Sequence, residues 1–257
     1  MNGIDYRLKE FINPSDGHSM IVDTSAGAAL GALPGLEDFE YGIQKFMHLV
    51  DGIVCNSGQA RRLRQSNKDL SAILLRADWT NTLRDEQFVL PVQSPRLVQL
   101  LDAQDASDFG VSAMVLSFLL GYSEEIEGAC MKAIVNTGIE GRARGIPLIV
   151  EVRPTGPRVS LPEKAVELGA SYALEGGADV IVVPYPGKSS LDTIAQFVSV
   201  PWLIKATSIE KAHSEIVQAM SIGCRGLWLD YTQFEASDPT ATLESFRREL
   251  HQVRLEA

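Results

Sequence analysis

Short runs of apolar, mostly β-branched residues alternate along the chain with longer segments in which apolar residues recur every three or four positions. The short runs are typical of buried parallel strands, and the longer pattern is typical of amphipathic helices. Eight strands are expected, at residues 20–23, 52–56, 72–78, 111–117, 147–151, 179–183, 202–205 and 226–230. Repeated strand–helix units predict an α/β fold with a parallel sheet, and this number of units predicts a (β/α)8 barrel.

Some of the helices between these strands have boundaries that the sequence marks. Residues 162–176 begin with a proline in the first turn and end in a glycine, which is the usual asymmetry of helix ends. Other helices are expected at residues 36–49, 123–145, 209–223 and 240–253. No linker or low-complexity tract divides the chain. We therefore expect one barrel domain over residues 1–257, with an N-terminal extension at 1–19 and a C-terminal helix at 240–253.

Polar residues at the carboxyl ends of the predicted strands are the first candidates for chemistry, because the active sites of such barrels lie there. They are Asp23, Asn56, Arg76, Asp78, Ser117, Glu151, Arg153, Tyr185, Lys205, Asp230 and Tyr231. Charged groups are costly to bury unless they are paired. Ion pairs that cap the barrel mouth would explain any one of these residues, whereas the whole ring favours a functional site.

The charge balance limits the classes of partner. The 257 residues carry 33 acidic and 23 basic side chains, a formal net charge of −10. An acidic chain without a basic cluster is a poor candidate for binding nucleic acid or an anionic membrane. The N-terminus has no apolar signal-peptide core, and no apolar run reaches the roughly 18 residues that a membrane helix needs. We expect a cytoplasmic protein with a small-molecule partner and neither a nucleic-acid nor a membrane partner.

Cysteines, histidines and one glycine-rich string have structural interpretations. The three cysteines are far apart and odd in number, which fits a reducing compartment and gives neither a disulfide framework nor a zinc site. The four histidines lie outside the strand ends, so a histidine-rich metal site is not expected. The Gly-Lys-Ser-Ser string at 187–190 lacks the spacing of a phosphate-binding loop. We interpret it as a loop and a helix start capped by Ser189 or Ser190. No metal or cofactor is expected.

Several segments carry a likeness to a known family. They are Arg-Leu-Lys-Glu-Phe-Ile-Asn-Pro at 7–14, Met-Ile-Val-Asp at 20–23, Pro-Gly-Leu at 34–36, Gly-Ile-Pro-Leu-Ile-Val at 145–150 with Pro-Thr-Gly at 154–156, Gly-Ala-Asp at 177–179 and Asp-Pro at 238–239. The chain resembles the DeoC/FbaB aldolases, which include archaeal-type class I fructose-bisphosphate aldolases and autoinducer-2 phosphate thiolases. The resemblance covers nearly the whole chain. It implies a class I aldolase barrel, a small carbonyl substrate and a homo-oligomer.

The chain departs from the family pattern in the site itself. Asp23 matches the family aspartate that assists proton transfer. By the same resemblance, Val182 stands where the family has its Schiff-base lysine, Arg153 where it has a tyrosine, and residues 206–208 and 230–232 where it holds substrate phosphate. A valine has no lone pair and cannot form an imine. Losing glycines and an arginine while gaining an aspartate weakens a phosphate cradle, so fructose-bisphosphate cleavage is not expected.

Lys205 offers a catalytic lysine at another strand end. Its amine must become neutral to form an imine, so its pKa must fall from about 10.4, and the nearby cations Arg76 and Arg153 would favour this. Asp23 and Glu151 would then transfer protons. The residues expected to contact the substrate are Asn56, Arg76, Asp78, Arg153, Tyr185 and Asp230. This hypothesis predicts an aldolase-like carbon–carbon lyase with an altered site, acting on a small carbonyl compound, phosphorylated or not. The alternative is that Lys205 only forms an ion pair with Asp230 or Glu151.

Two other functions fit the same residues. One is an acid/base enzyme that forms no imine, in which carboxylates carry protons or hold Mg²⁺ while Arg76 and Arg153 clamp an anionic group. The other is an aldolase-like barrel that binds a small ligand without catalysis, since several catalytic positions of the family have changed together. Retained lyase activity in Lys205→Ala would exclude the relocated lysine.

Overall fold

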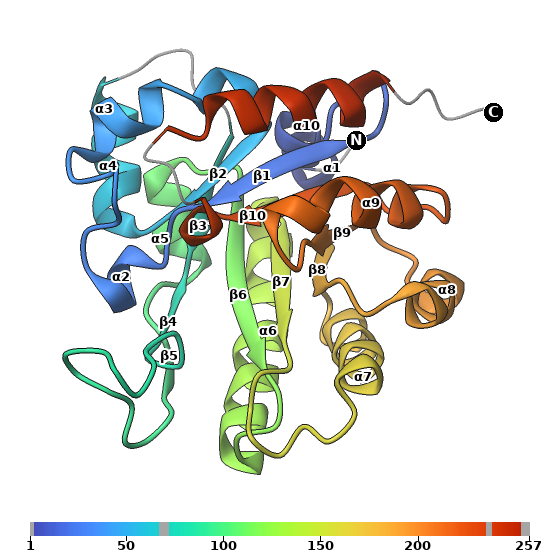
Figure 1. The fold of residues 1–257 in the computed structure, drawn as a ribbon. Coiled ribbons are helices and arrows are strands. Elements are labelled where there is room, and N and C mark those ends of the chain that lie inside the picture. The colour runs from blue at the N-terminus through green and yellow to red at the C-terminus, as the bar shows by residue number, and fades with distance from the viewer. Residues whose placement is uncertain (1–2, 67–71, 235–237, 253–257) are drawn as a thin grey trace.

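Eight parallel strands close into a barrel in the computed structural model, which describes residues 3–66, 72–234 and 238–252 (Figure 1). Around the barrel the order is β1-β10-β9-β8-β7-β6-β3-β2. The strands are β1 Ser19–Asp23, β2 Gly52–Cys55, β3 Ala72–Arg76, β6 Ala113–Leu119, β7 Leu148–Arg153, β8 Val180–Pro184, β9 Trp202–Lys205 and β10 Gly226–Asp230. The (β/α)8 fold predicted from the sequence is confirmed, and every predicted barrel strand overlaps an observed one.

Helices follow the strands and cover the outside of the barrel, except α1, which precedes β1. They are α1 Gly3–Phe11, α2 Gly27–Leu30, α3 Phe39–Gln44, α4 Ser57–Ser66, α5 Ala103–Phe109, α6 Glu124–Arg144, α7 Pro162–Glu175, α8 Lys188–Phe197, α9 Ile209–Met220 and α10 Thr240–Gln252, with 3₁₀ turns η1 Met47–Leu49 and η2 Tyr231–Gln233. The ends of α6 match the sequence signals, because the Ser123 side chain caps its start and Gly145 ends it in the left-handed conformation.

Two helix predictions need correction. The segment 36–49 is not one helix: Asp38 accepts a hydrogen bond from the Tyr41 amide, so α3 starts at Phe39, and the later apolar residues belong to η1. The start of α8 has Gly187 at the N-cap position and no side-chain cap. Ser190 donates to Glu167 at 2.5 Å and is therefore engaged elsewhere.

The predicted strand 72–78 is in fact two strands. The chain leaves the barrel at Ala77, and Asp78–Thr80 (β4) pairs antiparallel with Leu97–Gln99 (β5). This hairpin lies beyond the end of β3 (Figure 1). The apolar pattern runs through Ala77 without a break, so it could not reveal where the chain turns out of the barrel.

The barrel interior is filled by apolar side chains and is closed at its amino end. The inner cluster comprises Phe11, Ile21, Val54, Ala72, Leu74, Ala113, Val115, Ile149, Val180, Val182, Leu203 and Trp228. Phe11 comes from α1, so part of the segment predicted as an N-terminal extension, Gly3–Phe11, forms a helix that plugs this end. Val182 is fully buried in the cluster, between Glu151 and Leu203 on the neighbouring strands. Chemistry is therefore left to the carboxyl end, as is usual for this fold.

The described residues include no helix long and apolar enough to cross a membrane. The cysteines Cys55, Cys130 and Cys224 are all buried and unpaired. Burial raises the pKa of each thiol to about 12, which leaves them protonated and poorly nucleophilic at neutral pH.

Candidate active site at the barrel mouth

Arg76, the last residue of β3, lies at the centre of a buried charged cluster. Its Nη2 lies 2.5 Å from Asp23 Oδ2 and 2.8 Å from Glu151 Oε2. Its Nε and Nη1 donate to the hydroxyls of Ser25 and Ser117 at 3.1 and 3.2 Å. Every nitrogen of the guanidinium is thus engaged, and the side chain is only 6% exposed. Arg76 joins three strand ends and has no free face to offer a ligand.

Lys205 continues the cluster on the other side of Glu151. Its Nζ lies 2.7 Å from Glu151 Oε1 and 2.6 Å from Asp230 Oδ2. Glu151 is 1% exposed and bridges Arg76 to Lys205, while Asp230 is 24% exposed and lies nearer the solvent. Both ion pairs considered from the sequence for Lys205 are therefore present. We call Asp23, Arg76, Asp78, Glu151, Lys205 and Asp230 the mouth cluster.

The two carboxylates that hold Lys205 differ in their electrostatic surroundings. Burial alone would raise the pKa of Glu151, but Lys205, Arg76 and Arg153 outweigh it, and this pKa lies well below its ordinary value. Asp230 has Lys205 as its cation and has Glu151 and Asp23 as nearby anions. Burial therefore prevails, and the pKa of Asp230 is raised. Asp230 is the better proton acceptor of the pair.

The two cations are both held in the charged form. Burial alone would lower the pKa of Lys205, but Asp230 and Glu151 outweigh it and raise the pKa above its ordinary value. Burial would also lower the pKa of Arg76, and Asp23, Glu151 and Asp78 reverse this. The expectation that Arg76 and Arg153 make Lys205 neutral is therefore wrong for the resting protein, because the carboxylates contact Lys205 directly.

Other predicted site residues line the same mouth. Asp78 is buried, accepts a hydrogen bond from the Ser117 amide at 2.5 Å and lies 3.9 Å from Arg76, and burial raises its pKa. Asn56 donates to the Ser25 carbonyl at 2.9 Å. Arg153 is half-buried, and its guanidinium makes no hydrogen bond or ion pair with any part of the chain that the structure describes.

Tyr185 lies apart from these residues. It alternates with the inward-facing Val182 and Pro184, and it packs against the outer apolar layer between strands and helices. Its hydroxyl donates to Gln218 Oε1 on α9 at 2.6 Å. The tyrosine was expected from its place after the strand, but a change of one residue in position turns a strand side chain to the opposite face.

A cover over part of the mouth was not predicted. The indole of Trp79 on β4 donates to the Ala28 carbonyl of α2 at 3.0 Å, and Arg84 Nε donates to the Ala29 carbonyl at 2.9 Å. Beneath this cover is a cavity of about 20 Å³ lined by Ser25, Ala28, Ala29, Asn56, Arg76, Asp78, Trp79, Thr80, Leu83, Ser117 and Arg153. A cavity of that size holds about one water molecule.

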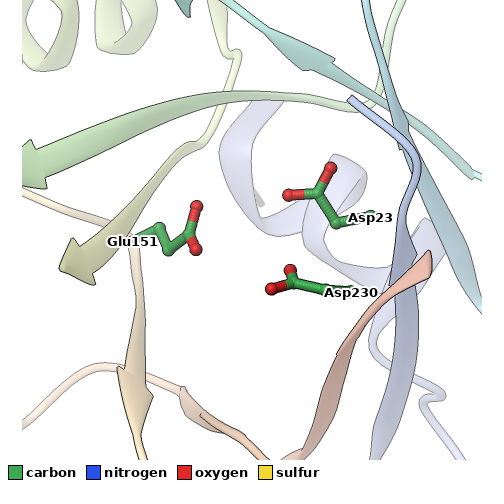
Figure 2. A group of neighbouring side chains, drawn as sticks. All are labelled: Asp23, Glu151 and Asp230. Atoms are coloured by element: carbon green, nitrogen blue, oxygen red, sulfur yellow. The ribbon is translucent and has the colours of Figure 1, made fainter. Parts of the chain in front are cut away.

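Three carboxylates of the mouth cluster also meet a geometric condition for a metal site. Asp23, Glu151 and Asp230 come from β1, β7 and β10 and point toward one another (Figure 2). They offer oxygens that all lie within 4.8 Å of one another. Oxygen ligands suit Mg²⁺, but here Arg76 and Lys205 neutralise these oxygens. The donor set is one of buried ion pairs and does not fit a resident metal.

No protein-family model matches the chain. An uncharacterized aldolase of Pasteurella multocida is 24% identical over 252 residues, which span 97% of this chain and 83% of that protein. A 3-hydroxy-5-phosphonooxypentane-2,4-dione thiolase of Escherichia coli O139:H28 is 24% identical over 254 residues, spanning 97% and 82%. The chain is thus similar to an aldolase and to a thiolase over nearly its whole length.

Solved structures give the same picture of the fold. An archaeal fructose 1,6-bisphosphate aldolase superposes with a TM-score of 0.79 at 18% identity, covering 98% of this chain and 100% of that one. A Schiff-base-forming fructose-1,6-bisphosphate aldolase gives a TM-score of 0.78 at 19% identity, covering 97% and 100%. These likenesses agree with the class I aldolase barrel that the sequence resemblance implied.

Proposed function

We propose that the protein is an aldolase-like carbon–carbon lyase in which Lys205 forms an imine with a small carbonyl substrate. The observation that carries the proposal is the position of Lys205 Nζ, 2.7 Å from Glu151 Oε1 and 2.6 Å from Asp230 Oδ2. A lysine between two carboxylates at the carboxyl end of the barrel has both a reactive amine and acceptors for its proton. Similarity to an aldolase and a thiolase supports the class of bond that is made or broken.

Imine formation requires that Lys205 first lose a proton. Asp230 takes this proton, because its raised pKa makes it the better acceptor. The neutral amine then attacks the carbonyl carbon, and its second proton passes to the former carbonyl oxygen. Asp230 returns the first proton to the same oxygen, which leaves as water, and a protonated imine remains. Asp230, expected from the sequence only to contact the substrate, is thus assigned the proton transfer.

The protonated imine then accepts the electron pair of the breaking carbon–carbon bond. Asp230, again a carboxylate, removes the hydroxyl proton of the leaving fragment, which departs as a carbonyl compound. Hydrolysis of the remaining enamine, after protonation on carbon, restores Lys205. Glu151 and Asp23 hold Arg76, and Glu151 also orients the lysine. We assign both to positioning because each carboxylate is bound to the Arg76 guanidinium, which stays charged throughout.

Borohydride trapping tests this proposal. The protein is incubated with aldehydes and ketones, phosphorylated and not, and then reduced, so that hydride adds to the imine carbon and fixes the adduct. Peptide mass spectrometry should find the adduct on Lys205 and should find none in Lys205→Ala. Lys188→Ala, which removes an exposed lysine after β8, should trap like the wild type. Absence of any lysine adduct, under conditions that label a known class I aldolase, would refute the imine.

One observation favours a second function, acid/base chemistry without an imine. The pKa of Lys205 is raised by Asp230 and Glu151, so the resting side chain is an ammonium that could stabilise a developing enolate by its charge. Lys205→Arg separates the two mechanisms, since it keeps the cation and removes the nucleophile. Retained turnover in Lys205→Arg, with no adduct in the wild type, would favour this alternative. Binding of carbonyl compounds without turnover would instead indicate a ligand-binding barrel.

A further inference from the structure

Arg153 is the cation of the mouth with unused hydrogen-bond donors. Arg76 has all its nitrogens engaged, and Lys205 lies between two carboxylates. The guanidinium of Arg153, by contrast, has no hydrogen-bond or ion-pair partner among the residues that the structure describes, although it borders the cavity under the α2–β4 cover. A half-buried arginine with five free donors is suited to bind an anion through two parallel hydrogen bonds.

The position of Arg153 fixes how far that anion lies from the reactive amine. Arg153 follows Glu151 by two residues on β7, so the two side chains share the inner face and their Cα atoms are about 6.6 Å apart. Glu151 in turn touches Lys205. The charge of Arg153 acts on both Glu151 and Lys205. An anionic group at Arg153 therefore lies within a few bonds of a carbonyl carbon that Lys205 attacks.

The loops that commonly bind phosphate in (β/α)8 barrels follow the seventh and eighth strands, here β9 and β10. After β9, the Thr207 amide donates to Glu215 Oε2 at 2.8 Å, and Glu215 is a buried carboxylate on α9. After β10, Gln233 Nε2 donates to the Ala206 carbonyl at 3.0 Å. Asp230 stands at the start of this second loop. An internal carboxylate thus occupies an amide that a phosphate would use, and a second carboxylate repels it.

Net charge favours a carboxylate over a phosphate. Asp23, Asp78, Glu151 and Asp230 stand against Arg76, Arg153 and Lys205, four carboxylates against three cations. A phosphate monoester would add about −1.5 to −2 charges at pH 7 to this excess of negative charge, whereas a carboxylate adds one.

From these observations we infer that the substrate is a short oxo acid, a carbonyl compound whose carboxylate binds Arg153 close to the carbonyl carbon, and that Arg153 determines this specificity. The inference rests on the proposed function only for the role of Lys205. It differs from the phosphorylated substrate named for the Escherichia coli relative, and the residues that set the difference are Arg153 and Glu215.

Three ketones with a three-carbon skeleton test the inference. Pyruvate carries a carboxylate next to the ketone, hydroxyacetone is neutral, and dihydroxyacetone phosphate carries a phosphate. Pyruvate should be trapped on Lys205 at least about tenfold faster than the others, as expected for one charge-assisted contact. Arg153→Gln should reduce pyruvate trapping by about tenfold to a hundredfold. Hydroxyacetone trapping should fall much less, because it loses only the effect of the Arg153 charge on Lys205. Arg158→Gln, an exposed arginine in the following loop, is the matched control.

Calorimetric titration without borohydride separates this inference from the imine. Pyruvate binding that requires Arg153, without any adduct, would refute the imine and support the oxo-acid site. Tighter binding of dihydroxyacetone phosphate, or faster trapping of it, would overturn the inference even if Lys205 forms the adduct. Equal losses of pyruvate and hydroxyacetone trapping in Arg153→Gln would also overturn it, because the arginine would then not read the carboxylate. Absence of pyruvate binding at millimolar concentration would have the same meaning.

Discussion

Charged side chains gather at both ends of the barrel, and the two groups bond to different kinds of partner. At the amino end, Asp16, His18, Asp51 and His251 form what we call the base cluster. Asp51 accepts a hydrogen bond from the Met20 amide, and His18 Nδ1 pairs with the Leu250 carbonyl. His251 bridges Asp16 and Asp51 at 2.7 and 3.2 Å. These contacts fasten α10 to the starts of β1 and β2.

The mouth cluster makes few hydrogen bonds to the backbone. The side chains of Arg76, Glu151, Lys205 and Asp230 bond to other side chains rather than to the backbone. They hold no terminal helix in place, and one more cation, Arg153, stands beside them with no hydrogen-bond partner for its guanidinium among the described residues. Buried ion pairs add little or no stability compared with apolar residues of the same volume. Charges that add so little stability are better explained by a role in catalysis. The base cluster therefore serves the fold, and the mouth cluster serves the chemistry.

The largest difference is expected in turnover when one cation is replaced at each end of the barrel. Lys205→Met removes the nucleophile, so turnover of any compound that forms the adduct should fall at least about 10⁴-fold, or roughly 5 kcal/mol in the barrier. Arg247→Met removes a cation that lies 3.8 Å from Asp51 at the base and should leave turnover unchanged. Steady-state kinetics on both variants makes the comparison. Equal losses of rate would mean that the mouth has no special role.

Replacing Arg76 at the mouth should also lower the free energy of unfolding more than replacing Arg247 at the base. Arg76→Met leaves Asp23 and Glu151 buried next to an apolar group, which should lower the free energy of unfolding by about 3–5 kcal/mol. Arg247 is 39% exposed, so Arg247→Met should lower it by at most about 1 kcal/mol. Urea denaturation at pH 7 measures both. A loss below that of Arg247→Met would show that the mouth carboxylates are not held by Arg76.

The alternation of apolar runs and helical segments predicted the barrel because each of the eight buried strands leaves a short apolar run, and the repeat of these runs is visible in the sequence. The same pattern placed Asp23, Arg76, Glu151, Lys205 and Asp230 at one end, and the structure brings all five together. Residues at the carboxyl ends of parallel strands must converge, so their positions along the chain were enough.

Other features depend on contacts that a single sequence does not encode locally. Trp79 covers the mouth only because β4 leaves the barrel and meets α2. Tyr185 turns outward because one residue of register reverses a strand side chain. Glu215 reaches Thr207 from a helix eight positions further on, and nothing in its helical segment marks it as a partner of a loop amide.

The base cluster gives a pH dependence that the mouth does not share. Hydrogen bonds that His251 donates to Asp51 and Asp16 raise its pKa against the effect of burial. A raised folded pKa means that its stabilisation is fully present below the unfolded value of about 6.5 and is lost as pH rises through the folded pKa. Burial lowers the pKa of His18, and the charges of His251 and Arg225 lower it further. Asp16 and the Leu250 carbonyl oppose this without reversing it, so His18 acts in the opposite sense.

His251→Asn should therefore destabilise the protein most below pH 6.5, by roughly 1.5–3 kcal/mol for charge-assisted hydrogen bonds, and less at pH 8.5. Urea denaturation at pH 5.5 and 8.5 measures the difference from wild type at each pH. His48→Asn, at an exposed histidine near the same end, is the control. A difference that grows with pH would contradict the base cluster as described, while trapping at the mouth should be unaffected throughout.

The smallest effect is expected at Glu215, where the mouth rejects phosphate. Glu215→Gln keeps an oxygen that can accept from the Thr207 amide but removes the negative charge. Affinity for dihydroxyacetone phosphate should therefore rise, by roughly tenfold at most, while affinity for pyruvate at Arg153 stays the same. Glu244→Gln removes an exposed charge on α10, another helix, and should change neither. Calorimetry with the two ligands provides the measurement. Equal gains for both ligands would indicate a general change in net charge, whereas a gain for the phosphate alone would identify Glu215 as the group that excludes it.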